Sequence, residues 1–557
     1  MGSMATVSVA EAQTIIAQGT CGDNLTWTLT DDGVLAVDGS GKMYDYGHYD
    51  DLAPWNSNRD KIKTVIIGDK VTTIGDYSFA NCSNSSSAII GNAVITIGNG
   101  AFMYCIELTS AIIGNSVATI GNNAFYFCYN LTSIDIPNSV VTIGMSAFYY
   151  CFALTSIEIP NSVVTIGSSA FLYCSGLISV IIGDAVTTIG EGAFYDCTNL
   201  KSVILGNAVA TIETRAFYEC RRLTLIVIPT SVHTMGYGVF SSCSDLTSID
   251  VDDNNPNYSS KEGVLYNKLQ DTLICCPGGK TGTVIIPSSV TTIGNFAFYD
   301  CRKLTSMTIP NSVITIGNYA FEHCLGLISI TIPNSVTTIG HLAFYYCTHL
   351  TSIEIPNAVN VIKESTFGYC RELTSVIIPD CVTTIENTAF TNCDRLKTVT
   401  IGKDVAIMGS TAFNGCNLDT IICKPTTPPD IKNYTFSGML SNAYIIVPCH
   451  TSSIYRDSDW GKIFTDFEED CTTGLHETFQ NETITIYPNP AQNVFFVECE
   501  NFTSVTIKLY DMLGREILIK NATGKAEIDI SDLPKGMYHA VAFSAGGVVG
   551  NRKIVKD

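Results

Sequence analysis

Cysteine is the residue of this chain whose number and spacing most suggest chemistry. The 557-residue chain has 22 cysteines, and fourteen of them close a Phe-x-x-Cys pattern that recurs between Phe79 and Cys416. Thiolates bind metal ions, but a zinc site needs close cysteine pairs that converge on one ion. Here the cysteines come singly, 23 residues apart, and a free cysteine packs as a small buried hydrophobe. The spacing therefore favours a ladder of packed thiols over a metal or redox centre.

Other residue types that carry catalysis occur without the patterns that catalysis needs. Among the eight histidines, His323, His341 and His349 fall in neighbouring repeats at different registers, so we expect them to face different sides. The sequence contains no Gly-x-Ser-x-Gly, His-Glu-x-x-His or phosphate-loop motif. The acidic run at 252–257 suits Ca²⁺, but it lacks the remainder of an EF-hand loop, which favours an Asx-rich turn. We expect no enzymatic activity, no metal and no cofactor. The cysteines outside the ladder, whose pairing the sequence does not determine, include Cys275, Cys276, Cys423, Cys449, Cys471 and Cys499.

A 23-residue repeat must position all of these residues. Because one such unit cannot bury its apolar face alone, a fixed period of this length predicts a solenoid of stacked units. The repeat is interrupted once, between Phe240 and Phe298. Its phenylalanine stands at positions 79, 102, 125, 148, 171, 194, 217 and 240, and then at 298, 321, 344, 367, 390 and 413.

Residues 154–174 show what one unit is expected to form. Ile157 and Ile159 point to the same side of a strand, and Glu158 points to the other. Pro160 ends the strand because it donates no backbone hydrogen bond. A second short strand follows at 163–166, and the segment ending at Cys174 is expected to form a helical or 3₁₀ turn. Stacking such units gives a parallel β-sheet with short second strands and helical or 3₁₀ turns.

The repeat Leu-x-x-Ile-x-Ile-Pro-Asn-Ser-Val-x-x-Ile-Gly-x-x-Ala-Phe-x-x-Cys resembles that of BspA-like leucine-rich-repeat proteins, surface or secreted proteins of anaerobic bacteria and some mucosal protists. The match runs from about Ile62 to Cys423 and departs at Ser85 and at Asn417-Leu418, near the ends. The resemblance implies a leucine-rich-repeat solenoid and attachment to matrix proteins.

The chain divides into successive segments. Residues 1–18 begin with Met-Gly-Ser-Met, which looks like an expression-vector remnant, and residues 5–18 have the spacing of a short helix. No signal peptide follows, so a leader would be missing from this sequence. A capping hairpin is expected at 19–61, where Trp27 and Trp55 either cover the first coil or form a sugar-stacking platform, and we favour covering. The solenoid follows at 62–423, with a hairpin insertion at about 252–281.

The C-terminal part is expected to contain a cap, a linker and a second domain. We expect Ile454, Tyr455, Trp460, Ile463 and Phe464 to close the last coil within a cap at 424–465. The acidic, polar stretch 466–482 is interpreted as a linker. Several short alternating strands with Gly and Pro turns at 483–557 predict a small β-sandwich.

Three motifs and a basic residue in this last domain resemble the type A sorting domain of the type IX secretion system of Bacteroidota. The resemblance implies translocation across the outer membrane, cleavage of the domain during export, and a cell-surface or secreted protein attached to the outer membrane. The residues that match the sorting motif are Tyr487, Pro488, Asn489, Pro490, Gly514, Arg515, Gly536, Tyr538 and Lys553.

Two exposed features are candidate partner-binding surfaces. The outward strand position is either an apolar binding stripe or a result of strand propensity, and the sequence favours neither. The tyrosines after the repeat phenylalanine suit protein or glycan contact, although a stacked ladder that covers the core edge is favoured. The strand position carries Ile66, Ile89, Ile112, Asp135, Glu158, Ile181, Ile204, Val227, Asp250, Thr308, Thr331, Glu354, Ile377 and Thr400. The aromatic position carries Tyr126, Tyr149, Tyr150, Tyr173, Tyr195, Tyr218, Tyr299, Tyr345, Tyr346 and Tyr369.

The composition of the chain excludes some classes of binding partner. The formal net charge is −21, and residues 483–557 hold eight basic and eight acidic residues, so the excess lies upstream. An acidic solenoid is a poor binder of nucleic acid or anionic membrane, and no apolar run approaches the length of a membrane span. We expect a monomeric, non-enzymatic surface protein that binds host matrix proteins, other cells or glycans. The alternative is a glycan- or nutrient-capture module that acts beside a surface enzyme.

The sorting motifs lead to an export prediction. In a cell with a type IX system, deleting residues 483–557 should trap the protein in the periplasm, and fusing them to a periplasmic reporter should carry the reporter outside. Cell fractionation and surface labelling measure both outcomes, and the reporter without the fusion is the control. Surface arrival of the truncated protein would show that this domain is a structural cap and not an address.

Overall fold

The computed structural model describes residues 13–438, 443–471, 484–487, 491–499, 505–511, 515–523, 525–544 and 547–556. Contacts group the chain into two compact units. The first runs to Ile421 and takes in Pro429–Ala443, and the second consists of Ile422–Pro428 and the chain from Tyr444 onward.

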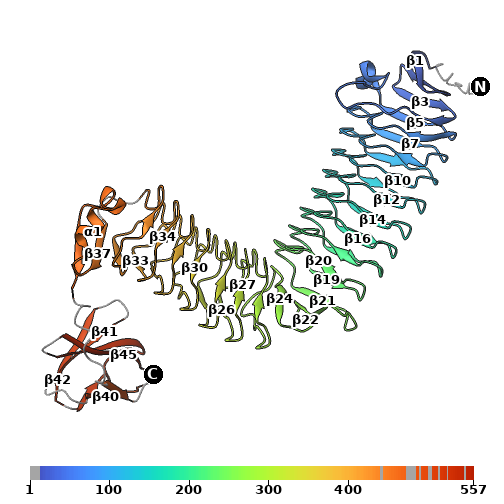
Figure 1. The fold of residues 1–557 in the computed structure, drawn as a ribbon. Coiled ribbons are helices and arrows are strands. Elements are labelled where there is room, and N and C mark those ends of the chain that lie inside the picture. The colour runs from blue at the N-terminus through green and yellow to red at the C-terminus, as the bar shows by residue number, and fades with distance from the viewer. Residues whose placement is uncertain are drawn as a thin grey trace, which may run out of the picture. The chain divides into compact units, whose positions relative to one another are not determined.

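The first unit is a leucine-rich-repeat solenoid whose coils stack in sequence order (Figure 1). The first strands form several successive parallel sheets, within which equivalent residues of neighbouring coils pair, as in Ile66 with Ile89 and Ile89 with Ile112. Alternate residues are buried, which gives the inward and outward sides that the Ile-x-Ile pattern predicts. These strands are β5 (Thr64–Ile67), β7 (Ser87–Ile90), β9 (Ser110–Ile112), β11 (Ser133–Ile134), β13 (Ser156–Ile159), β15 (Ser179–Ile182), β17 (Ser202–Ile204), β19 (Leu225–Ile228), β21 (Ser248–Val251), β26 (Ser306–Thr308), β28 (Ser329–Thr331), β31 (Ser375–Ile377) and β33 (Thr398–Ile401). β35 (Thr420–Cys423) follows them.

The predicted second strands form a separate parallel column, most of them only two residues long. Thr119 pairs with Thr96 on one side and with Thr142 on the other, so this column also keeps the 23-residue register. Its strands are β6 (Val71–Ile74), β8 (Thr96–Ile97), β10 (Thr119–Ile120), β12 (Thr142–Ile143), β14 (Thr165–Ile166), β16 (Thr188–Ile189), β18 (Thr211–Ile212), β20 (Thr234–Met235), β25 (Thr292–Ile293), β27 (Thr315–Ile316), β29 (Thr338–Ile339), β30 (Val361–Ile362), β32 (Thr384–Ile385), β34 (Ile407–Met408) and β36 (Asp430–Ile431).

Two ladders fill the interior between the columns. The repeat phenylalanines stack face to face, with ring centroids 5.3 Å apart for Phe102 and Phe125. The repeat cysteines are buried, and each thiol from Cys105 onward in the first run donates to a phenylalanine carbonyl of the preceding coil, as Cys197 Sγ does to Phe171 O at 3.3 Å. Burial raises the pKa of Cys82 to about 12, so the thiol form persists. The packed-thiol interpretation is confirmed.

The turn that carries Phe-x-x-Cys is not a regular helix. The residue two positions after the phenylalanine adopts a left-handed backbone, for example φ +60° at Tyr150, although it has a side chain. Its N–H therefore points to the next coil, where Tyr150 N donates to Leu172 O at 2.9 Å. Left-handed backbone costs a non-glycine residue about 1–2 kcal/mol, and the hydrogen bond to the next coil offsets this cost.

Three antiparallel strands cap the first coil: β1 (Ile15–Gly22), β2 (Leu25–Thr30) and β3 (Val34–Gly39). β3 then pairs in parallel with β5. β4 (Gly41–Lys42) and the 3₁₀ helix η1 (Asn56–Lys61) complete this end. The helix expected at 5–18 is wrong for its described part, because Ile15 and Ile16 belong to β1, whose pairing with β2 outweighs the helical spacing of its apolar residues.

The insertion forms a meander of β22 (Tyr258–Lys261), β23 (Val264–Asn267) and β24 (Thr272–Cys275). β24 joins the second-strand column by pairing with β25. The 252–257 run is an Asx turn: Asn255 is buried, its amide nitrogen donates to Pro229 O and Val232 O, and its Oδ1 accepts from Asn257 N and Tyr258 N.

The second unit begins with the parallel pair β37 (Tyr444–Pro448) and β38 (Phe467–Asp470). The helix α1 (Ser452–Arg456) and the 3₁₀ helix η2 (Asp459–Lys462) lie between these strands in sequence. Tyr455, Trp460 and Phe464 are buried as expected, whereas Ile454 and Ile463 are exposed, which corrects their predicted closing role.

The linker interpretation of 466–482 is wrong for its first part. The acidic residues of β38 pair with β37, and Cys471 forms a disulfide with Cys449. Residues 472–482 lie outside the described residues.

The remaining strands form two antiparallel sheets around a small core that includes Phe495, Leu509 and Ile554. This is the predicted β-sandwich. No described helix is long and apolar enough to cross a membrane. The strands are β39 (Ile484–Tyr487), β40 (Val494–Cys499), β41 (Val505–Tyr510), β42 (Glu516–Ala522), β43 (Lys525–Asp529), β44 (Gly536–Ser544) and β45 (Gly547–Lys556).

The thiol ladder leads to a stability prediction. Cys197→Ser should lower the free energy of unfolding by about 1–3 kcal/mol, because the serine hydroxyl loses its contact with water in an apolar interior. The C–O bond of serine is also shorter than the C–S bond of cysteine, which weakens the contact with Phe171 O. Urea unfolding followed by circular dichroism measures the change.

Cys381→Ser is the matched control. Cys381 is partly exposed and donates to Val359 O, and other coils already have serine there, as Ser162 donates to Val140 O. This control should be neutral. Equal effects of the two substitutions would contradict a specific role for the buried ladder.

Candidate functional site

The outward strand position forms an exposed column along the first-strand sheet. Isoleucine predominates in its N-terminal part, and Ile112 and Ile204 are 63% and 60% exposed. Ile181 lies beside Glu158 on one side and Ile204 on the other. The column alternates between apolar groups and carboxylates, with Asp135 and Glu158 in successive coils. It therefore offers a partner two apolar stretches that are separated by negative charge.

The structure places the predicted members of this column as expected, with two differences in exposure and one omission. Ile66 and Thr400 are only half-exposed. Ile285 was missed and is 74% exposed. Its Val-Ile-Ile-Pro context matches the repeat, so the sequence carried a signal for it, but the insertion precedes it and Ile285 belongs to no strand.

The tyrosine column consists of half-buried rings that cover one another. Tyr126 stacks on Tyr149 with centroids 4.7 Å apart, and Tyr150 stacks on Tyr173 at 4.4 Å. Burial and the neighbouring tyrosines raise the pKa of Tyr149 to about 12. This arrangement agrees with the favoured ladder interpretation. Similar stacks join Tyr195 to Tyr218, and Tyr346 to both His323 and Tyr369, while Tyr345 meets Tyr346 and Tyr369 edge-on.

The two N-terminal tryptophans are structural. Trp27 and Trp55 are buried and meet edge-to-face. Trp55 stacks on Phe79 at 5.1 Å and its Nε1 donates to Ser78 O at 2.8 Å, so it is the first rung of the phenylalanine ladder. At the other end Phe413 stacks on Phe436. The covering role is confirmed, and a sugar-stacking platform of these two rings is wrong because neither presents a free face.

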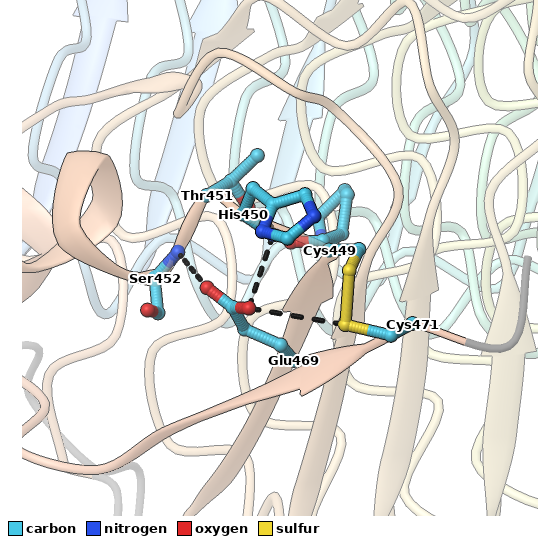
Figure 2. Close-up of a disulfide and its surroundings, with 7 residues drawn as sticks. Cys449, His450, Thr451, Ser452, Glu469 and Cys471 are labelled. Atoms are coloured by element: carbon cyan, nitrogen blue, oxygen red, sulfur yellow. Dashed lines mark hydrogen bonds between the residues drawn. A yellow bond between two sulfur atoms is a disulfide. The ribbon is translucent and has the colours of Figure 1, made fainter. Parts of the chain in front are cut away.

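A possible metal-ligand cluster lies in the C-terminal cap, at Cys449, His450 and Glu469. Figure 2 shows that two of its three members, Cys449 and Glu469, already have other partners. Cys449 is bonded to Cys471, and the Glu469 carboxylate accepts the N–H groups of His450 and Ser452, each at 3.0 Å. Hydrogen bonds from Ser452 and His450 lower the pKa of Glu469 to about 2. These contacts attach the loop that follows β37 to strand β38.

The three histidines of neighbouring repeats do not converge. His323 stacks on Tyr346, His341 Nδ1 lies 3.8 Å from Glu386, and His349 Nδ1 contacts Leu325 O at 2.6 Å. They serve three separate local contacts.

The sorting-motif residues take structural positions in the small domain. Tyr487 Oη accepts a hydrogen bond from Lys525 Nζ at 2.6 Å. Arg515 binds Asp511 through Nε at 2.7 Å and through its own N–H at 2.9 Å. Tyr538 is buried and donates to Pro534 O, and Gly536 has a φ of +154° that favours glycine.

Other motif residues are less fully described. Pro488, Asn489, Pro490 and Gly514 lie outside the described residues. Lys553 in β45 pairs through its backbone with His539 in β44. Sequence reasoning missed Lys556, a buried lysine whose Nζ donates to Ile530 O, Ser531 O and Leu533 O. The alternation of Ile554 and Lys556 placed Lys556 on the inward side, and this was the available signal.

The geometry defines a leucine-rich-repeat solenoid protein with a separate β-sandwich. The family model of the BspA type leucine rich repeat region matches residues 57–178, 164–271, 275–393 and 360–458. These matches cover well over half of the chain, so the chain belongs to the BspA-type leucine-rich-repeat family. Residues 485–557 match the family model of a secretion system C-terminal sorting domain.

Solved structures of bacterial leucine-rich-repeat proteins are similar to this chain. A protein from Bacteroides ovatus is 26% identical, with 74% of this chain and 98% of that chain covered and a TM-score of 0.45. A protein from Eubacterium ventriosum is 27% identical, with 72% and 95% covered and a TM-score of 0.40. A leucine rich cell surface protein from Faecalibacterium prausnitzii is 23% identical, with 82% and 99% covered and a TM-score of 0.43. No curated protein matches the chain.

The sorting domain indicates type IX export, either to the cell surface or into the medium, and so implies contact with the secretion machinery. Leucine-rich-repeat proteins of this fold are generally binding proteins without enzymatic activity.

The Glu469 contacts lead to a pH prediction. The folded carboxyl has a lowered pKa, so its contribution is complete above its ordinary value of 4.5 and is lost as the pH falls toward about 2. Glu469→Gln should therefore speed reduction of the Cys449–Cys471 disulfide by a phosphine at pH 7. The difference from the natural protein should shrink between pH 4.5 and 2. Mass spectrometry of the freed cysteines gives the rate.

Glu468→Gln changes an exposed neighbour on the same strand and is the control, with no expected effect. Equal reduction rates for Glu469→Gln and the natural protein at pH 7 would contradict the fastening role.

Proposed function

We propose that this protein is an adhesin-like binding protein whose solenoid recognises protein partners through the exposed column of the first-strand sheet. The partners belong to the host matrix or to other cells. The observation that carries the proposal is the run Ile181, Ile204 and Val227, in which three exposed apolar side chains occupy successive coils. Strands β15 and β17 hold the first two in direct register.

Physical reasoning supports this choice of surface. An exposed apolar run on a rigid sheet loses no backbone entropy when a partner covers it, and each covered isoleucine contributes about 1–2 kcal/mol. Glu158 and Asp250 flank the run and are exposed, so basic groups at the edge of a partner would fix its register.

The proposal includes attachment to the outer membrane after export, loss of the sorting domain on the way, and a monomeric solenoid. The sorting-domain match supports export itself. A glycan-capture role has less support, because the tryptophans are buried and the tyrosine faces cover one another.

Substitutions that keep strand propensity test the surface. Ile181→Thr combined with Ile204→Thr should weaken partner binding by about tenfold or more, because the apolar contact is lost while the fold already accepts threonine at this position in Thr308 and Thr331. Binding is measured by interferometry with the full chain, after a screen of matrix proteins and mucins identifies a partner.

The matched control is Val141→Thr combined with Val164→Thr. Both valines are exposed to a similar degree but lie beside the second-strand column, where a neighbouring coil has Thr187. Equal losses in both variants would refute the choice of surface, and a screen in which only glycans bind would favour the capture module.

A further inference from the structure

The insertion leaves a break in the second-strand column. β20 is the last strand of one nine-stranded sheet, and β24 belongs to a different sheet that continues with β25, although β20 and β24 are successive along the solenoid (Figure 1). In the nine-stranded sheet that ends at β20, most second strands pair with the next through threonine beside threonine. Here the spacing between successive repeat phenylalanines rises from 23 to 58 residues, from Phe240 to Phe298.

A pocket of about 170 Å³ opens at this break. One wall consists of residues 235–241, and the other of Tyr258, Thr272, Ile274, Cys275 and residues 294–296. Four of the fourteen lining residues are aromatic: Tyr237, Phe240, Tyr258 and Phe296. Tyr237 is 62% exposed. Phe240 stacks on Phe217 and Phe296 stacks on Tyr319, so these two rings pack against the coils on either side of the break.

One polar group in the wall has no partner. Ser241 is 97% buried, and its hydroxyl has no hydrogen-bond partner among the described residues. A buried hydroxyl without a partner costs about 1–3 kcal/mol. Ser241 occupies a position where other coils carry tyrosine, such as Tyr218 and Tyr299. Because no bond holds its rotamer, the hydroxyl can turn toward a group that enters the pocket.

We propose that this pocket binds a free small molecule that consists of one aromatic ring system with a single hydrogen-bonding group, of the size of phenol or indole. The volume sets the size, because an apolar cavity of about 150 Å³ accommodates benzene. The four rings supply edge and face contacts, and Ser241 supplies the hydrogen bond. This ligand is independent of the partner proposed for the first-strand column.

The chain contains its own reporter of occupancy. Cys275 lines the pocket and is partly exposed, whereas nearly all the other described free cysteines are buried. Cys381 is also partly exposed and lies in another coil. Indole or phenol should slow alkylation of Cys275 in the full chain, with half-protection on the order of 1 mM for ligands this small, and should leave Cys381 unchanged. Peptide mass spectrometry after timed alkylation measures both residues in one sample.

Variants and ligand analogues complete the test. Met235→Trp fills the pocket and should abolish protection, whereas Thr234→Trp places the same ring on an exposed neighbour and should retain it. Ser241→Ala should weaken phenol about fivefold and leave toluene unchanged, the effect of one neutral hydrogen bond. N-acetyltyrosinamide carries the same ring as an amino-acid side chain. It should protect Cys275 far more weakly than phenol does, because its two amide groups do not fit within the pocket.

Three results would overturn the proposal. The first is no protection of Cys275 by indole or phenol in the natural chain, a measurement that needs no variant to fold. The second is protection that Met235→Trp leaves intact while its far-ultraviolet circular dichroism is unchanged. The third is equal protection by N-acetyltyrosinamide, which would assign the pocket to an aromatic side chain of a partner instead of a free molecule.

Discussion

Contact between each residue and its own counterpart 23 positions away is the constraint on which the solenoid depends. Strands of two to four residues have little stability alone, and here they gain it by pairing with similar strands of neighbouring coils. The phenylalanine stack and the bond from each thiol to a carbonyl of the preceding coil repeat with the same period. Even the left-handed residue at Tyr150 is held by a hydrogen bond to the next coil. A coil without neighbours would lose all of these contacts together.

The same constraint explains where variation is found. Inward positions repeat almost unchanged because each must fit its copy above and below, whereas the outward strand position changes among Ile112, Asp135, Glu158 and Thr308. The ends are closed by a ring of another kind, Trp55, and by the last phenylalanine of the stack, Phe436. Both proposed binding sites therefore lie where the repeat places no constraint on the residue, either on the outward face or at the break that the insertion creates.

Much of this fold follows from the sequence because its contacts are periodic. The strands and the buried cysteines could be deduced from spacing, and the covering role of Trp27 and Trp55 from the need to close the open end of a solenoid. The failures concern contacts outside the period. Ile15 has helical spacing to its neighbours, but it pairs with Thr30 in β2. The charges of β38 suggested a linker, although edge strands carry charge without difficulty.

The candidate surfaces were less predictable than the core. Exposure of the outward column followed from alternation, whereas the pocket depends on how β24 meets the coil before it, and spacing does not contain this information. Lys556 was overlooked because a buried lysine is rare, and only the arrangement of three carbonyls makes it acceptable.

The buried thiols impose an order of events on an exported chain. An unfolded copy in an oxidising compartment exposes many cysteines that can join wrongly. Loops of about ten residues close in roughly 10–100 ns, whereas disulfides form over seconds to hours. Coils of 23 residues can thus assemble long before oxidation, and each thiol disappears into the interior as its coil forms. Oxidant that arrives later can still reach Cys449 and Cys471 in the cap, which form the disulfide, and the partly exposed Cys275 and Cys381. Rapid local assembly thus acts as its own protection against misoxidation.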